Sequence, residues 1–433
     1  MSRVTEYQYD AIPRESMDHI VRAALVGLND KQGGVCAQCC TILHKIGVHQ
    51  DDGEDNVQTN ILSNYFNPVL QELTKTSGRQ DHEEHNLRMT SHEALNVWIE
   101  NCANDCLPTI QQLLPPMLAR LSGTMGMSIR EQTELHPKLL STINVCLARL
   151  YSGDTDVRPN LALAFCDDVM RAALTIMASN NDAPVAEAEC LLVIMAVITA
   201  TGQDFLKYLQ HAYQYILNAV KKTDSPNVCK CAIAIMGDAA TELGEGMLPY
   251  CDAIMQEFFA ILRNSDQDTV GIKPTVFTAF GSFALSIGPA FEKYLPVVMT
   301  LMREAATVQL PDNVDEETLE YMTELRSEIM ASYPCILQGI GDSGHQQQLV
   351  PYVQGMFEVV QTVVAAEEDE EVIGHTVGLL GDLAAMYGNQ IAGLINQYQQ
   401  PIQKCLTSAL QDSDEQTRQT AQFAQQQINN AVR

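Results

Sequence analysis

Apolar residues recur along most of the chain every three to four positions, and no stretch keeps the two-residue alternation of a half-buried strand. Over residues 248–263 one wide apolar face is formed by Ile254, Met255, Phe258, Phe259, Ile261 and Leu262. Residues 295–306 repeat this pattern with Leu295, Val298, Met299, Leu301 and Met302. The periodicity predicts an all-α protein whose helices each bury one face.

The helices follow a repeated order of features. A helix rich in small residues ends at a glycine in each of several copies, at Gly202, Gly244, Gly288, Gly341 and Gly388. A Leu-Pro or Val-Pro step opens the next helix at Pro108, Pro249, Pro296 and Pro351. Glycine supplies the left-handed residue that ends a helix, and proline is accepted in the first turn of the next one. Each unit is therefore predicted to be helix, short turn, helix.

A period of about 40–47 residues built from two helices is typical of HEAT-type repeats. We count roughly nine such units over residues 1–433, in a single array of antiparallel helix pairs. The predicted fold is a HEAT-repeat α-solenoid, a right-handed superhelix whose concave face can wrap a long partner. Residues 15–28 have the pattern of a second helix with no polar capping helix before them. We therefore expect the chain to be the C-terminal part of a longer solenoid.

The chain is strongly acidic, with 54 Asp and Glu against 26 Lys and Arg and a formal net charge of −28. Such a charge repels phosphate backbones, so nucleic-acid binding is not expected, and a basic partner is favoured. We find no run of about 18 uncharged apolar residues and no signal-peptide pattern at the N-terminus, so we expect no membrane insertion. A cytosolic or nuclear location follows.

Catalytic and metal-binding signatures are weak. Most of the 13 cysteines stand singly on helical patterns, as core residues do. Cys36, Cys39 and Cys40 have only His44 as a nearby fourth ligand, and one amphipathic helix cannot turn all four side chains inward. The repeated Gly-Asp pairs at 237–238 and 381–382 fall inside predicted helices and not in phosphate-binding loops. We expect no metal, no cofactor and no enzymatic activity.

Several segments carry a specific resemblance. The segments "VGIKPTVFTAFGSFALSIGPAFEKYLPVVMTLMREAA", "YMTELRSEIMASYPCILQGIGD", "NLRMTSHEALNVWIENCANDCLPTIQQ", "GQDFLKYLQHAYQYI" and "VGLLGDLAAMYGNQI" resemble the C-terminal half of the importin β family of nuclear import karyopherins. The likeness runs in order from about residue 15 to the C-terminus. No single motif is diagnostic, and the colinear series makes the resemblance specific.

The resemblance implies a nuclear transport receptor. In this family the second helices, on the inside, wrap a basic segment of the adaptor importin α or a basic cargo with acidic side chains and Trp. Slots between the outer first helices hold Phe of Phe-Gly nucleoporins, and Ran-GTP releases the cargo. The implied location is the cytoplasm, the nucleus and the nuclear pore. A different HEAT scaffold, such as a phosphatase regulatory subunit, is the alternative, and it would not bind Phe-Gly peptides.

Three aromatic positions depart from the family pattern. The family Trp of the terminal helix aligns with Phe423, which keeps a flat apolar surface. A second family Trp, expected in the helix of "VCAQCCTIL", aligns with Ala37. The only Trp, Trp98, stands where the family has an ordinary core residue, and we predict that it is core.

Two sets of site residues follow. For the basic segment, Asp252, Glu257 and Glu292 lie on or beside helix faces that the apolar stripe does not use, and Phe423 offers a stacking surface. For nucleoporins, Phe277 and Phe280 are candidates to line a slot. The alternative that both phenylalanines pack inside the repeat stays open, because their helix is otherwise rich in small residues.

Overall fold

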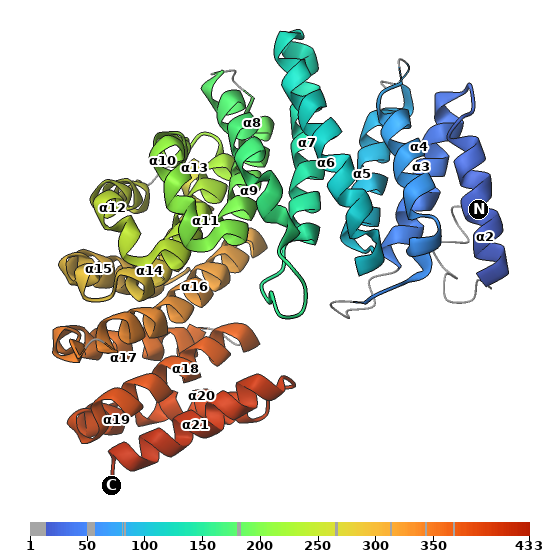
Figure 1. Cartoon of the computed structure of the whole chain (residues 1–433). Helices are drawn as coiled ribbons and strands as arrows, with labels where there is room; N and C mark the ends of the chain where they lie inside the picture. The colour runs from blue at the N-terminus through green and yellow to red at the C-terminus, as the bar shows by residue number, and fades with distance from the viewer. Residues whose placement is uncertain are drawn as a thin grey trace. The chain divides into compact units, whose positions relative to one another are not determined.

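The computed structural model describes residues 14–49, 57–79, 81, 84–179, 183–264, 267–311, 314–342, 344–366 and 369–433. These residues form α-helices and short 3₁₀-helices joined by turns, and none of them lies in a β-strand (Figure 1). The all-helical prediction is confirmed. The chain divides into two compact units, Met1–Thr201 and Gly202–Arg433, called unit 1 and unit 2, and each is described by itself.

The described part of unit 1 contains helix pairs in which an opening helix packs along the closing helix that follows it. The pairs are α2 (Arg14–Gly27) with α3 (Gly33–Val48), α4 (Phe66–Ser77) with α5 (Leu87–Glu100), α6 (Leu107–Gly123) with α7 (Ile129–Leu150), and α8 (Cys166–Ala178) with α9 (Pro184–Thr201). Each closing helix also packs against the next one, so the closing helices form a layer.

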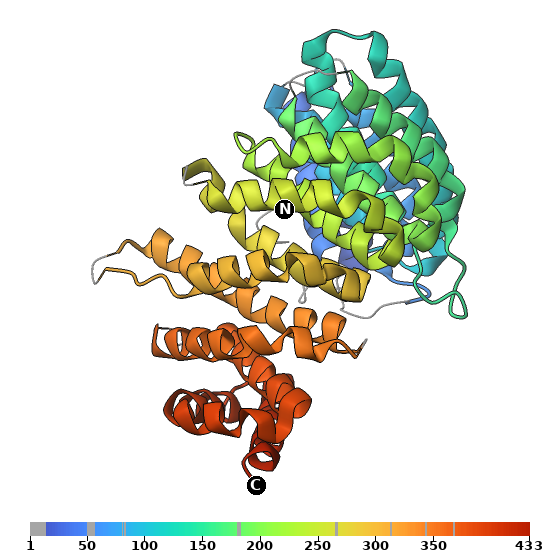
Figure 2. The ribbon, with the colours of Figure 1, turned by 90° about the vertical axis from the view of Figure 1, so that its left-hand side faces the viewer.

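Unit 2 follows the same plan, and its helices from α15 onward stack in chain order in both views (Figures 1 and 2). Its opening helices are α10 (Leu206–Val220), α12 (Leu248–Arg263), α15 (Leu295–Ala306), α17 (Val350–Ala366), α19 (Ala392–Gln397) and α20 (Gln399–Leu410). Its closing helices are α11 (Pro226–Leu243), α14 (Lys273–Ile287), α16 (Glu316–Gly341), α18 (Glu370–Tyr387) and α21 (Glu415–Ala431), and the short α13 (Gln267–Val270) precedes α14.

The pairing differs from the predicted repeat by one helix. We expected the helix before each glycine to pair with the helix after it, but the opening helix that packs along α11 is α10, which precedes it, and not α12. The terminal helix α21, predicted to open the last unit, closes the pair with α20. A short turn shows that two helices are consecutive, but it does not show which neighbour shares the larger interface. The repeat count, the continuity of the array and the handedness of a superhelix stay predictions.

The glycine turns have the predicted backbone in four of five places. Gly202, Gly244, Gly288 and Gly388 have φ of 50°, 51°, 51° and 49°, a region that side chains with a Cβ rarely enter. The expectation for Gly341 is wrong, because this glycine is the last residue of α16 and the positive φ, 76°, falls at Gly344. The connection from α16 to α17 is longer than the others, so the chain reverses later.

Two stretches, residues 184–220 and 273–306, are long and apolar enough by composition to cross a membrane. Each is interrupted by a positive-φ glycine, Gly202 or Gly288. Most of their large apolar side chains pack in the helical core, where Ile194 and Phe283 are fully buried. Trp98 is also fully buried and donates its indole N–H to the carbonyl of Leu43 at 2.7 Å, which confirms its prediction as core.

The closing layer of unit 2 is packed so closely that helix backbones almost touch. A Cβ added at Gly339 of α16 would lie 2.1 Å from the carbonyl oxygen of Ala284 in α14. One added at Gly381 of α18 would lie 3.1 Å from the Cα of Ala424 in α21. The opening helices of unit 2 pack against one another less closely. Glycine in these helices is therefore required by the approach of a neighbouring helix.

Candidate binding surfaces

One side chain from each closing helix of unit 2 contributes to a row across that layer. Its members, which we call the closing-layer row, are Asp238, Ser282, Cys335, Asp382 and Phe423. The row follows the positions where glycines let neighbouring closing helices approach closely. A Cβ added at Gly237 would be 3.5 Å from Ser282 Oγ, and one at Gly281 would be 3.1 Å from Cys335 Cβ. A Cβ at Gly381 would be 3.1 Å from the Phe423 ring, and the charge of the next residue, Asp382, acts on the Cys335 thiol.

The carboxylates of this row are not neutralised. Burial raises the pKa of Asp382 above its usual range. Burial also raises the pKa of Asp238, and the charge of Glu242, one helical turn later, adds to the effect. Within the described part of the chain, Asp238 and Asp382 of the row, and the neighbouring Glu242, have no hydrogen-bond donor and no cationic partner. A cation placed between them would relieve both desolvation and repulsion.

Phe423 offers the accessible aromatic surface that the sequence predicted. Its side chain is 42% exposed in α21. The sequence pattern placed Asp238 and Asp382 inside helices and not in phosphate-binding loops, and it did not indicate that they belong to an acidic row. The sequence feature that could have indicated this row is the repeated Gly-Asp pair inside two helices. A glycine marks a point where two helices cross, and the residue after it then lies at the edge of that crossing.

The three carboxylates predicted for the basic segment lie elsewhere and have partners of their own. Asp252 of α12 accepts hydrogen bonds from Lys293 Nζ at 2.6 Å and from the Tyr294 hydroxyl at 2.5 Å. These hydrogen bonds, that of Lys293 first, lower the pKa of Asp252. Glu257 of α12 lies 3.3 Å from Lys221 Nζ. Neither residue shares a helix layer with Phe423.

Glu292, the third predicted carboxylate, belongs to the 3₁₀-helix η9 (Gly288–Tyr294). One of its carboxylate oxygens is 3.9 Å from His345 Nδ1. Like the two α12 carboxylates, it lies outside the closing layer. The structure therefore does not bring Asp252, Glu257 and Glu292 together with Phe423 in one site.

The phenylalanines predicted to line a nucleoporin slot are buried. Phe277 and Phe280 are 1% and 0% exposed, so neither ring lines a surface slot in this structure. Their centroids lie 6.0 Å apart, and the Phe280 ring packs 6.1 Å from Phe258 and 5.9 Å from Phe259 of α12. The aromatic side chains of α14 are needed to pack this helix against α12. This is the alternative that the sequence analysis left open.

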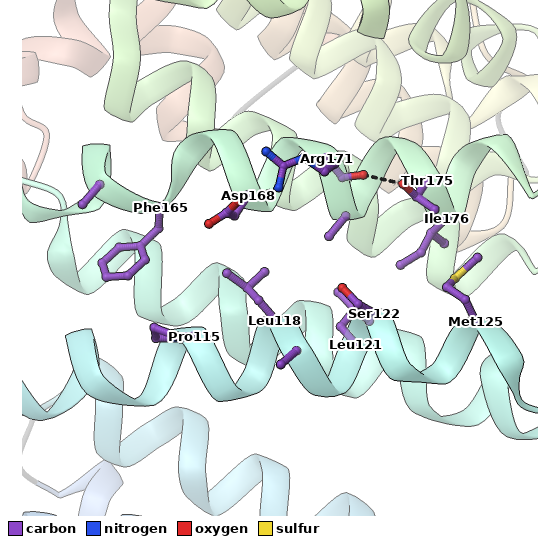
Figure 3. Close-up of a pocket in the computed structure, with 13 residues that line it drawn as sticks. Pro115, Leu118, Leu121, Ser122, Met125, Phe165, Asp168, Arg171, Thr175 and Ile176 are labelled. Atoms are coloured by element: carbon purple, nitrogen blue, oxygen red, sulfur yellow. Dashed lines mark hydrogen bonds and ion pairs between the residues drawn. The ribbon is translucent and has the colours of Figure 1, made fainter.

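An open apolar slot lies instead between the opening helices α6 and α8 of unit 1 (Figure 3). Its volume is about 400 Å³, and Pro115, Leu118 and Leu121 of α6 face Phe165 and Ile176 across it. The small side chains of Ala119, Ala164 and Ala172 keep it open. Asp168 and Arg171 lie at its edge and form an exposed ion pair of 2.6 Å. The slot can receive an apolar side chain and present a charged pair to its backbone.

A second slot lies on the other side of α6, between α4 and α6. Its volume is about 520 Å³, and its lining is more polar, with Asn67 and Gln71 on α4 facing Thr109 and Gln112 on α6. The adjacent prolines of α6 divide between the two slots. Pro115 lines the slot with α8 and Pro116 lines the slot with α4.

No group of three or more His, Cys, Asp or Glu side chains suited to a metal ion occurs among the described residues. The Cys36 thiol donates to the carbonyl of Leu28 at 3.3 Å, in the core contact expected of a small apolar residue. Burial raises the pKa of Cys36, and it also raises the pKa of Cys40, to about 12. These thiols are therefore protonated near neutral pH.

Two solved structures of Kap95 share the fold. The chain matched in the Kap95:Nup1 complex is 22% identical with a TM-score of 0.79, and the match covers all of this chain and 49% of the matched chain. Kap95p, whose binding induces the switch loops of RanGDP to adopt the GTP-bound conformation, is 23% identical with a TM-score of 0.75 and the same coverage.

Closer similarity is found to importin beta itself. Importin subunit beta-1 of Arabidopsis thaliana is 27% identical over 429 residues, which are 97% of this chain and 48% of the relative. A crystal structure of importin beta matches all of this chain and 50% of its own with a TM-score of 0.89 at 25% identity. The chain thus spans about half the length of the relatives it matches. The model of the importin subunit beta-1-like family, TPR repeats, matches residues 19–412, and the chain belongs to this family.

Proposed function

We propose that the protein is a nuclear import receptor, and that this chain corresponds to the C-terminal portion of importin β. It works by binding and not by catalysis. Its proposed ligands are a basic segment, of an importin-α-type adaptor or of a cargo, and Phe-Gly nucleoporins, and Ran-GTP would release the cargo. The observation that carries the proposal is the closing-layer row of unpaired carboxylates ending in an exposed Phe, in a family of import receptors.

We infer that the basic segment lies along the closing layer of unit 2. This layer is more closely packed than the opening layer, as the inner side of a curved stack must be. Asp238 and Asp382 can accept from Lys or Arg, and Phe423 can stack on an apolar stem or a guanidinium group. Each exposed ion pair contributes only about 0–1 kcal/mol, so affinity comes from several contacts and from long-range attraction.

Fluorescence anisotropy with a labelled basic peptide tests this site. The double charge reversal of Asp238→Lys with Asp382→Lys should weaken binding by about tenfold or more. The double reversal of Asp252→Lys with Glu257→Lys is the matched control, because it changes the net charge equally at carboxylates that already pair with Lys293 and Lys221. It should change binding less than about twofold. Binding should also weaken steeply as salt rises. Equal losses in the row variant and the control would refute the placement.

We infer that a nucleoporin Phe occupies the α6–α8 slot. The slot has an apolar lining, and its volume of about 400 Å³ has room for one aromatic side chain and the residues beside it. The solved Kap95:Nup1 complex shows that a protein of this fold forms a complex with a nucleoporin. Burying a Phe side chain contributes about 2–3 kcal/mol, so one slot binds weakly and exchange is fast. Fast exchange suits passage through a pore.

Filling the slot tests this assignment. Ala172→Trp should abolish binding of a Phe-Gly peptide in a pull-down, because Ala172 lines the slot on α8. Gln112→Trp fills the neighbouring α4–α6 slot and serves as the control, because it can act on the α6–α8 slot only indirectly through α6 and should weaken binding much less. If the control abolishes binding and Ala172→Trp does not, the ligand belongs in the other slot.

Ran-GTP and Phe-Gly binding together separate this function from that of another HEAT scaffold, such as a phosphatase regulatory subunit. An import receptor should bind Phe-Gly peptides and distribute between the cytoplasm, the nucleus and the nuclear pore. Full-length receptor should release the basic peptide when Ran-GTP is added. Binding of a phosphatase catalytic subunit, with no binding of Phe-Gly peptide, would favour the scaffold.

A further inference from the structure

Three cationic side chains gather around a buried histidine in unit 1, outside the residues that line either slot. Arg88 and His92 come from α5, Arg120 from α6 and Lys138 from α7. Arg88 and His92 are only 7% and 3% exposed. Glu134 pairs with Arg88 Nη1 at 2.7 Å, and the charges of Glu134 and Glu93 also act on Lys138. A chain with a net charge of −28 thus carries a local excess of positive charge in its interior.

Two buried polar atoms of this cluster have no hydrogen-bond partner among the described residues. They are Arg88 Nε and His92 Nε2. Arg88 and His92 are four residues apart on α5, so their side chains lie on the same face, one turn apart. Buried polar groups nearly always have partners, and a buried guanidinium N–H has a particularly strong need of one. We therefore expect a group from outside these side chains to satisfy the two atoms.

The hydrogen bonds of Thr142 indicate which ring nitrogen of His92 carries the hydrogen. The Thr142 hydroxyl donates its one hydrogen to Asn96 Oδ1 at 2.7 Å or to the carbonyl of Lys138 at 3.0 Å. It therefore accepts from His92 Nδ1, 3.0 Å away. Burial, followed by the charges of Arg120, Lys138 and Arg88, lowers the pKa of His92 to about 3, so the ring is neutral.

A neutral ring with its hydrogen on Nδ1 leaves a lone pair on Nε2. The site thus offers one charged donor, at Arg88 Nε, and one acceptor, at His92 Nε2, under the positive field of Arg120 and Lys138. A ligand that matches it must be an anion and must also carry a hydrogen to donate.

We propose that unit 1 binds inorganic phosphate at this cluster. An unprotonated phosphate oxygen accepts from Arg88 Nε, a P–OH group donates to His92 Nε2, and the negative charge offsets Arg120 and Lys138. Sulfate has the same shape but carries no hydrogen at neutral pH, so it leaves Nε2 unsatisfied. Water satisfies both atoms and leaves the charges uncompensated. The burial of Arg88 and His92 admits a small ion and not a phosphorylated peptide.

Two features of the neighbourhood agree with an anion. The first turn of α5, which contains Arg88, has no acidic residue and no side-chain cap. Arg120 donates to Ser77 Oγ at 3.0 Å and to the Ser77 carbonyl at 3.3 Å, so its guanidinium is held in place without a carboxylate. Arg120 is thus positioned by neutral groups and keeps its charge available to a ligand.

Calorimetric titration of the full chain with phosphate and with sulfate, at equal ionic strength and pH 7, tests the proposal. Phosphate should bind at a single saturable site, and sulfate should bind about tenfold more weakly or not at all, for lack of one hydrogen bond to a buried acceptor. Absence of saturable phosphate binding in the millimolar range would mean that water alone fills the site, and it would overturn the proposal. Equal binding of the two anions would also overturn it.

Variants locate the bound phosphate. His92→Leu should remove the preference for phosphate over sulfate. If that variant does not fold, Lys138→Gln, at a half-buried position, should weaken phosphate binding about tenfold. Lys293→Gln is the control, because it removes an equal charge from an ion pair in unit 2 and should leave phosphate affinity unchanged. Equal losses in Lys138→Gln and the control would show a non-specific charge effect and refute the site.

Discussion

The closing helices of the two units meet in different ways. In unit 1, α5 and α7 are joined by polar side chains: Arg88 pairs with Glu134, His92 with Thr142, and Asn96 donates to Ser141 Oγ at 3.2 Å. In unit 2 some hydrogen bonds also cross the layer, such as Thr278 to Glu328 at 2.6 Å. Its closest contacts, however, are between backbones at Gly339 and Gly381.

The difference shows that one two-helix plan tolerates two kinds of interface with opposite weaknesses. A hydrogen-bonded interface holds helices one side-chain length apart and fails when a partner is removed. A glycine interface holds backbones in contact and fails when an atom is added. Substitutions that remove atoms should therefore harm unit 1 most, and substitutions that add atoms should harm unit 2 most.

The largest effect is expected from Gly339→Ala. The added methyl would lie 2.1 Å from the Ala284 carbonyl oxygen, so α14 and α16 must separate. We expect a loss of about 3 kcal/mol in the stability of unit 2, although alanine favours a helix over glycine. Urea unfolding with hydrogen exchange read separately for each unit measures it.

Gly393→Ala is the control for that substitution. No atom lies within 4 Å of a Cβ added at Gly393 in α19. The change should be neutral or stabilising by up to about 1 kcal/mol. A loss as large as that of Gly339→Ala would show that alanine is harmful in these helices for reasons other than close approach.

Thr142→Val should lower the stability of unit 1 by about 1–2 kcal/mol and leave that of unit 2 unchanged. This change keeps the shape of the side chain and removes the buried partner of His92 Nδ1. Thr175→Val is the matched control, because the Thr175 hydroxyl donates only within its own helix, to the carbonyl of Arg171. It should stay within about 0.5 kcal/mol of the parent. Equal losses in the two variants would contradict the hydrogen-bonded interface.

The smallest expected change in stability is a gain and not a loss. Burial raises the pKa of Asp382, so ionising this carboxylate is harder in the folded chain than in the unfolded one. Stability is therefore greatest below the unfolded pKa of about 3.9 and falls as pH rises through the higher folded value. Asp382→Asn should raise the melting temperature by about 1 °C at pH 7, and the gain should vanish toward pH 4.

The same variant should weaken basic-peptide binding, so stability and affinity change in opposite directions. Thermal scans at several pH values, together with anisotropy titrations, measure both. A variant that is less stable than the parent at pH 7 would show that the Asp382 carboxylate has a stabilising partner. Such a partner would remove one of the unpaired charges from the closing-layer row.

The sequence predicted the helices, the glycine turns and the buried Trp98, because these depend on local periodicity and backbone preference. It predicted the wrong helix pairs, since Gly244 marks a turn without indicating which neighbour α11 packs along. It also misplaced the slot: Phe277 and Phe280 have the composition of an aromatic binding surface, but packing against α12 requires both rings. The helices of Asp382 and Phe423 come together through the close approach at Gly381, which no spacing along the chain reveals.

The adjacent prolines of α6 have a consequence for cooperativity. Pro115 and Pro116 cannot donate backbone N–H groups, so this helix lacks two of its own hydrogen bonds and bends more easily than its neighbours. It is also the common wall of two slots. A ligand that pushes α6 toward α4 widens one slot by narrowing the other. Linkage is reciprocal, so ligands in the two slots would antagonise each other without touching.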